Sequence, residues 1–234
     1  TISSDTKLYA IAYAKGKSPS EIVSAEYDRV VNDEEENYEI NTLGYITDYY
    51  GDETDLYIPS SIQGKKVRGI ASSAFEKNPR IRTVKLPDSA TKINSKAFAG
   101  CTALVSVSGN GITEIGTNAF ENSSIVSFDF PNLVTIGNKA FTDCYNLITI
   151  SIPKVETIGV NSFSKTPELI ALNGESVIEV GSSAFEESGV KSVDLPKVTK
   201  VGRNVFAGCE NLTELDVSQW QVGNVEDMGA MFGH

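Results

Sequence analysis

Three cysteines and one histidine are the residue types in this chain that most readily support catalysis or metal binding. Cys101, Cys144 and Cys209 offer thiols, and His234 offers an imidazole. A hydrolase needs a general base beside its nucleophile. His234 is the last residue of the sequence, and the pattern places no activating partner beside any Ser or Thr. We therefore predict no catalytic residue and no enzymatic activity.

The three cysteines share one position in a repeated pattern, because each lies three residues after Phe98, Phe141 or Phe206. Equivalent positions in neighbouring units of a parallel stack lie about 4.8 Å apart. The nearest two cysteines would thus be roughly 10 Å apart, beyond the disulfide limit of about 7 Å. We predict three separate, small buried side chains, with no metal and no cofactor.

Carboxylates raise two further possibilities for chemistry. An acidic cluster surrounds Gly51 and could suggest calcium, but its spacing misses the pattern of a calcium loop. We interpret this cluster, formed by Asp48, Asp52, Glu53 and Asp55, as the tip of a hairpin. Asp194 and Asp216 could meet across a sheet, but an open face that excludes no water is a poor place for catalysis.

Composition restricts the classes of partner. The chain has 234 residues, a net charge of -11 and 40% hydrophobic residues, enough for a core. Binding to nucleic acid needs clustered Lys and Arg, so we predict no nucleic-acid partner. There is no apolar run of about 18 residues, so we predict no transmembrane segment, and we expect that any signal peptide has been removed or was never included. The oligomeric state stays open.

An internal repeat marked by Ala-Phe or a close variant dominates the sequence. The phenylalanines recur every 21 to 23 residues, and a β-branched aliphatic residue precedes each one by five positions. The seven pairs are Ile70/Phe75, Ile93/Phe98, Ile115/Phe120, Ile136/Phe141, Ile158/Phe163, Val180/Phe185 and Val201/Phe206. A unit this small cannot bury its own apolar face, so the period indicates a solenoid with a continuous ladder of buried phenylalanines.

An apolar comb of the form Leu-x-x-Ile-x-Ile follows each phenylalanine and predicts one short strand per unit, stacked in parallel. The expected strands cover residues 83–86, 106–108, 127–130, 149–152, 171–173, 192–195 and 214–217. Short helical turns are expected around each phenylalanine. Glycines after the aliphatic residue, such as Gly116 and Gly137, are expected to allow the bend into these turns.

Leu-x-x-Ile-x-Ile-Pro followed by Val-x-x-Ile-Gly-x-x-Ala-Phe-x-x-Cys resembles the BspA-like (Treponema-type) leucine-rich repeat, over roughly residues 54–217. The resemblance implies an α/β fold: a right-handed, β-rich leucine-rich-repeat solenoid with parallel strands, short helical turns and about seven repeats of 21 to 23 residues, at residues 65–217. Residues 38–64 resemble the hairpin that caps such arrays. Residues 218–234, with Trp220, Met228, Met231 and Phe232 at core positions, resemble the start of a Met-Met-Phe-type bacterial surface repeat. We therefore expect a piece of a longer protein.

Residues 1–37 allow two interpretations. The alternation in Leu8-Tyr-Ala-Ile-Ala-Tyr favours a strand, and Ser18-Pro-Ser-Glu is a capping box ahead of a short helix from Pro19 to about Val31. The alternative is a degenerate repeat insertion. Eight of the nine tyrosines precede residue 58, which suggests either a sugar-stacking platform or packing over the end of the solenoid. We favour the packing.

Proteins of the family that the chain resembles are exported to bacterial or protist surfaces and are associated with adhesion. The resemblance therefore implies a secreted or cell-surface module that binds a protein partner, such as a host matrix or cell-surface protein, through a curved repeat surface. One alternative is a structural spacer on the cell surface. The other is glycan binding through the tyrosine-rich N-terminal segment.

The predicted binding surface consists of the two outward residues that flank the central apolar residue of each comb. These are Thr83, Lys85, Ser106, Ser108, Ser127, Asp129, Thr149, Ser151, Ala171, Asn173, Ser192, Asp194, Glu214 and Asp216. The series begins with a lysine and ends in carboxylates, so a basic patch of a partner is expected near the C-terminal units. The alternative is that these side chains only keep the strand face soluble.

Overall fold

The computed structural model describes residues 6–10, 23–27, 35–220 and 231–233 of a chain that forms two units, 1–32 and 33–234. In the first unit, β1 (Thr6–Ala10) pairs antiparallel with β2 (Val23–Tyr27). The helix predicted from Pro19 is wrong at residues 23–27. Val-Ser-Ala-Glu-Tyr alternates apolar and polar residues with the period of two that suits a strand.

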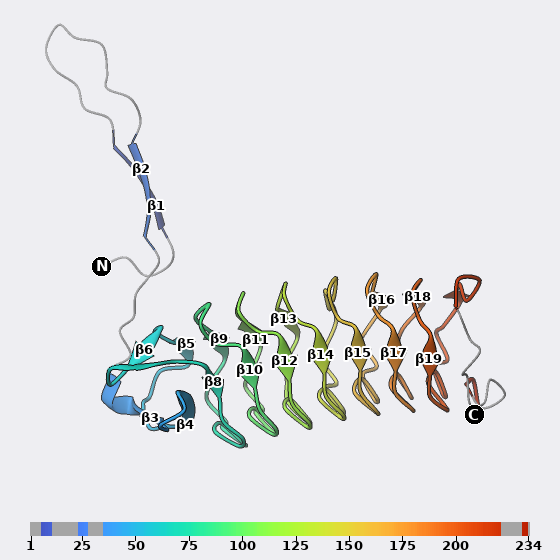
Figure 1. The fold of residues 1–234 in the computed structure, drawn as a ribbon, viewed down its shortest axis with the longest axis horizontal. Helices are drawn as coiled ribbons and strands as arrows, with labels where there is room; N and C mark the ends of the chain where they lie inside the picture. The colour runs from blue at the N-terminus through green and yellow to red at the C-terminus, as the bar shows by residue number, and fades with distance from the viewer. Residues whose placement is uncertain (1–5, 11–22, 28–34, 221–230, 234) are drawn as a thin grey trace, which may run out of the picture. The chain divides into compact units, whose positions relative to one another are not determined.

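The second unit is a solenoid with parallel sheets along its length (Figure 1). The first sheet surface contains the comb strands, which stack in register: Val84 pairs with Leu56 on one side and with Val107 on the other. This confirms the parallel stacking. The strands are β5 (Asp55–Tyr57), β9 (Thr83–Lys85), β11 (Ser106–Ser108), β13 (Ser127–Asp129), β16 (Ala171–Asn173), β18 (Ser192–Asp194) and β20 (Glu214–Leu215).

The strand predicted at residues 149–152 is wrong, because Thr149 forms only an isolated bridge to Ser127. The comb strands therefore split into one sheet of four strands and one of three. Phe128, the one aromatic residue at a central comb position, lies just before the break, and its ring packs 4.9 Å from that of Phe141. We attribute the break to this ring, since it fills more volume than the Val or Leu of other units.

A second parallel sheet, which the sequence analysis did not predict, runs through the aliphatic residues that precede each phenylalanine. After the hairpin strand β4 (Tyr45–Tyr49) it adds one two-residue strand per unit. These are β8 (Gly69–Ile70), β10 (Lys92–Ile93), β12 (Glu114–Ile115), β14 (Thr135–Ile136), β15 (Thr157–Ile158), β17 (Glu179–Val180) and β19 (Lys200–Val201). The aliphatic residues thus anchor a sheet as well as the core.

The start of the second unit covers the first phenylalanine. After a 3-10 helix at Glu35–Asn37, β3 (Tyr38–Ile40) pairs antiparallel with β4, and β6 (Ser61–Ile62) pairs antiparallel with β7 (Lys65–Lys66). Tyr38 and Tyr49 are buried with ring centroids 4.8 Å apart, and Tyr49 lies 6.5 Å from Phe75. Packing of tyrosines over the end of the solenoid is confirmed for these two residues.

The segments around the phenylalanines are turns, not the predicted helical turns. In every unit the residues two before and two after the phenylalanine have positive φ, as at Asn118 and Asn122 around Phe120. A left-handed residue interrupts a right-handed helix. The turns instead form a third ladder of hydrogen bonds between units, in which the Phe120 amide donates to the Ala140 carbonyl at 2.8 Å.

The phenylalanines form the predicted buried ladder. From Phe75 to Phe206 successive ring centroids lie between 5.0 and 5.6 Å apart with nearly parallel planes. Each ring is at most 2% exposed. The core is therefore one continuous aromatic column with aliphatic residues of both sheets around it.

The glycines that follow the aliphatic residue in five of the seven units serve a different purpose from the predicted one. Gly137 and Gly181 do not have positive φ, so no special bend requires them. A Cβ atom on Gly181 would lie 2.5 Å from the Val160 amide nitrogen of the preceding unit. Close approach between units, and not a bend, excludes a side chain there.

Candidate binding surface

The outward strand residues lie where the sequence predicts. In each named comb strand the central residue is more buried than its neighbours, as in Ser127, Phe128 and Asp129. The predicted residues are half-buried or exposed: Thr83, Lys85, Ser106, Ser108, Ser127, Asp129, Thr149, Ser151, Ala171, Asn173, Ser192, Asp194, Glu214 and Asp216. Parallel pairing of the strands places these residues side by side in two groups, one on each comb sheet, because the strands are interrupted at residues 149–152. Thr149 and Ser151 lie in that gap.

Charge on this surface changes along the solenoid. Near its start, Lys85 is in register with Tyr57, and its Nζ lies 5.9 Å from the centroid of that ring. Near its end, Glu214 is in register with Ser192, one strand away from Asp194. Hydrogen bonds from Ser218 lower the pKa of the Asp216 carboxyl, so this group keeps its charge in mild acid. The C-terminal end is thus acidic.

An aliphatic row, which the sequence analysis missed, borders the outward strand residues. It consists of Val105, Val126, Ile148 and Ile170, one from each of four consecutive units. Val105, Ile148 and Ile170 are 38%, 40% and 48% exposed, and Val126 is half-buried. The sequence does hold an indication of it: two adjacent apolar residues open each of these four combs, and only the first can point inward.

Backbone hydrogen bonds fix the aliphatic row in register. The Val126 amide donates to the Val105 carbonyl at 2.9 Å, and the Ile148 amide to the Val126 carbonyl at 3.0 Å. The Ile170 amide donates to the Ile148 carbonyl at 3.4 Å. The same ladder places Arg82 before Val105 and Lys191 after Ile170. Four apolar side chains are therefore held side by side on the outside of the solenoid.

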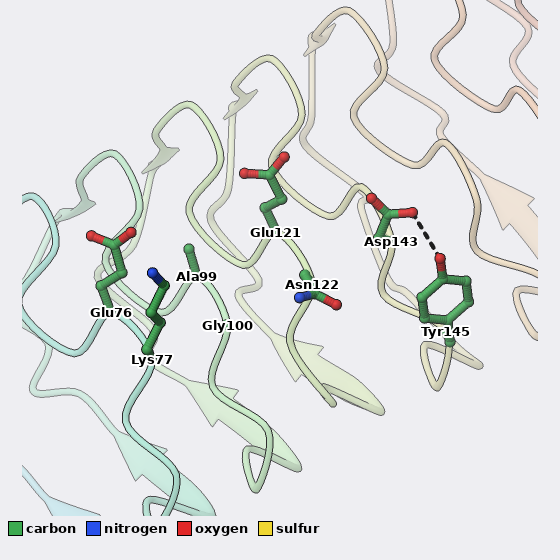
Figure 2. Close-up of a pocket in the computed structure, with 8 residues that line it drawn as sticks. All are labelled: Glu76, Lys77, Ala99, Gly100, Glu121, Asn122, Asp143 and Tyr145. Carbon is green, nitrogen blue, oxygen red and sulfur yellow. Dashed lines mark hydrogen bonds between the residues drawn. The ribbon is translucent and has the colours of Figure 1, made fainter.

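An open hollow lies beside the phenylalanine turns (Figure 2). Its lining comes from four successive turns and includes Glu76, Lys77, Glu121 and Asp143. The Tyr145 hydroxyl donates to Asp143 at 3.0 Å, and this bond raises the pKa of Tyr145. No cluster of three or more His, Cys, Asp or Glu residues suited to a metal occurs in the described part of the chain.

The cysteines occupy equivalent inner positions, as predicted, but they also donate hydrogen bonds to the preceding unit. Cys101 Sγ lies 2.9 Å from the Phe75 carbonyl oxygen, and Cys144 Sγ lies 3.0 Å from that of Phe120. Burial raises the pKa of both thiols to about 12. Cys209 makes the same bond to Phe185 but is only partly buried. None of the three forms a disulfide.

Trp220 and Met231 of the C-terminal tail pack on the last units. Trp220 is buried and its indole N–H donates to the Leu195 carbonyl at 2.9 Å. Met231 is buried, and its carbonyl accepts from the Phe206 amide at 2.9 Å. Phe232 remains 52% exposed, so it is not the fully buried core residue that the tail motif implies. Met228 lies outside the described residues.

Helices in the described ranges lack the length and apolarity needed to cross a bilayer. The profile of the BspA type leucine-rich repeat region matches six copies, over residues 68–176 and 170–229. No curated protein matches the chain significantly.

Solved structures that are similar to the chain include two crystal structures. One is a leucine-rich cell surface protein from Faecalibacterium prausnitzii A2-165, with a TM-score of 0.65 and 25% identity, where the match covers 80% of this chain and 53% of the other. The second is a leucine-rich repeat protein of T. pallidum, with a TM-score of 0.58 and 28% identity over 81% of this chain and 79% of the other. The chain thus spans about half the length of the Faecalibacterium protein.

Proposed function

Because the chain belongs to the BspA type leucine-rich repeat family, we propose that it is a secreted or cell-surface module that binds a protein partner in adhesion. The observation that carries this proposal is the surface formed by the outward strand residues and the aliphatic row. The similarity to a leucine-rich cell surface protein supports the location. A host matrix or cell-surface protein is the kind of partner we propose.

The physical properties of this surface suit a protein interface. Its backbone is hydrogen-bonded from unit to unit, so little conformational entropy is lost when a partner binds. Its small hydroxyl side chains, such as Ser106 and Ser127, leave room for close approach. Its exposed aliphatic side chains add apolar area, and the acidic end supplies electrostatic steering.

Binding of the chain to immobilised, purified extracellular-matrix proteins tests the proposal, with a glycan array measured in parallel. A matched pair of variants adds the same charge to two different surfaces of the solenoid. Ser108→Arg with Ser151→Arg alters the outward strand surface, and Thr135→Arg with Thr157→Arg alters the second sheet. We expect the first pair alone to reduce binding to a matrix protein by at least tenfold.

Two outcomes would contradict the proposal. If no matrix protein binds while a glycan does, the module recognises sugars. If both pairs of substitutions reduce binding equally, the outward strand surface is not the interface.

A further inference from the structure

We propose that the aliphatic row is the docking site for an amphipathic α-helix of a partner protein, laid along the solenoid axis. This inference rests on the proposed function and names the class of partner. It is carried by three features of the row: its apolar exposure, its spacing and the opposite charges beyond its two ends.

The first feature is the apolar exposure of the row, whose two long sides carry almost no charge. On the strand side the neighbours are Ser106, Ser127, Thr149 and Ala171. On the other side the side chains at Ala103, Ser124 and Asn146 are also uncharged, and Glu168 is the one charged neighbour. In a chain with 22% charged residues, three exposed aliphatic side chains and the half-buried Val126, among small or neutral neighbours, form a surface that is stabilised by apolar cover.

The second feature is the distance between successive members of the row. Adjacent units lie about 4.8 Å apart, and one helical turn rises about 5.4 Å. Over the three steps from Val105 to Ile170 a helix accumulates a mismatch of only about 2 Å. An extended peptide presents side chains on one face about 6.7 Å apart, and its mismatch would reach about 6 Å. A helix with one apolar residue per turn therefore fits the row better than a strand.

The third feature is the charge at each end, which gives the bound helix one direction. The start of the row has the cations Arg82 and Lys85 in the adjacent unit, with the carboxylates Asp55 and Glu53 one unit further away, and its end has Asp194, Glu214 and Asp216 beside Lys191. The charges nearest the first end are thus positive, and the second end is net negative. A helix with acidic residues at its N-terminus and basic residues at its C-terminus complements this pattern, and such a distribution also stabilises the helix itself.

A labelled synthetic helix of 18 residues tests the proposal, with Leu at positions i, i+4, i+7 and i+11, Glu in its first turn and Lys in its last. Its affinity for the full chain is measured by fluorescence anisotropy. The variant Ile148→Ser with Ile170→Ser removes half of the row. Its control is Val160→Ser with Ile178→Ser, at 39% and 43% exposed residues outside the row. All four positions are exposed, and thermal unfolding verifies each fold.

We expect the row variant to weaken binding at least tenfold and the control to change it less than twofold. Ile170→Thr, a smaller change, should weaken it several-fold. A peptide with Glu and Lys exchanged should bind at least threefold more weakly at low salt.

No binding to the chain, equal losses in row and control variants, or equal affinity for a proline-containing extended peptide of the same composition would each overturn the helix proposal. Equal affinity for the charge-exchanged peptide would overturn its direction. If the peptide fails while a matrix protein still binds the outward strand surface, the proposed function stands without this inference. If neither the peptide nor any matrix protein binds, the helix proposal and the proposed function are both wrong.

Discussion

Phe141 stacks on Phe120 with ring centroids 5.0 Å apart and ring planes only 2° apart. Phe163 lies on its other side at 5.2 Å, so the Phe141 ring is covered on both faces. Its exposed fraction is 0%. The ring therefore links three units of the core.

Phe141→Ala should lower the free energy of unfolding by about 3–5 kcal/mol, since it leaves a cavity in the middle of the column. Phe232 stacks on Phe206 at 6.2 Å but is 52% exposed, so Phe232→Ala should cost much less. Chemical denaturation of both variants measures the difference. Equal, small losses would show that the column does not stabilise the fold.

Ser162 provides a second test of the core, because it replaces the alanine that precedes the phenylalanine in most units. Its side chain is fully buried, and its hydroxyl has no hydrogen-bond partner among the described residues. A buried hydroxyl without a partner costs about 1–3 kcal/mol. Ser162→Ala should therefore stabilise the protein by about 1 kcal/mol.

The matched control for Ser162→Ala is Ala184→Ser, which places a hydroxyl at the equivalent, fully buried position of the next unit. It should destabilise the protein by a similar amount. Thermal unfolding of the two variants is compared with that of the parent. A loss of stability in Ser162→Ala would mean that the hydroxyl has a partner, such as a bound water.

The sequence predicts the stacking and the column well but not the shape of each turn. Phenylalanine spacing and comb alternation depend on burial, which leaves a clear periodic pattern. The left-handed residues leave no such pattern in the sequence, since Ser73, Lys96 and Asn118 share a backbone conformation but no side-chain type. The hydrogen bonds that hold them run between units, so a pattern within one unit does not show them.

The aliphatic row was missed for a related reason. A second apolar residue after Leu104 or Leu147 looks like part of the core when only composition is considered. The backbone decides which of two adjacent side chains points outward. Val105 and Ile148 do so, and their exposure is recognisable only once the units are in register.

The buried thiols make stability depend on pH in the alkaline range. The pKa of Cys144 rises from 9.0 to about 12 on folding, because burial disfavours the thiolate. The unfolded chain therefore loses its proton first as pH rises. The free energy of unfolding is therefore unaffected by this thiol below about pH 9, and it falls as the pH rises from 9 towards 12. At pH 10 the loss is on the order of 1 kcal/mol for each fully buried thiol.

Cys144→Ala should therefore show a smaller fall in unfolding free energy between pH 8 and pH 10 than the parent. Cys209→Ala serves as the control, since Cys209 is only partly buried and should contribute less. Urea unfolding at the two pH values measures this. Cys144 should also react with thiol reagents only after denaturation, and rapid labelling of the native protein would contradict its buried position.

The acidic end of the outward strand surface should control the rate at which a partner with a basic end binds. Glu214, Asp194 and Asp216 are exposed, so they act mainly through long-range steering, which salt screens. With the charged synthetic helix as probe, the association rate should fall as ionic strength rises from 20 to 200 mM. Replacing the three carboxylates by Ser should flatten this dependence.

Replacing Glu156, Glu175 and Glu187, which are equally charged and exposed but lie outside the surface, should change the slope much less. Stopped-flow anisotropy gives both slopes, and equal slopes for the two triple variants would mean that only net charge matters and that this end of the surface has no special part in binding.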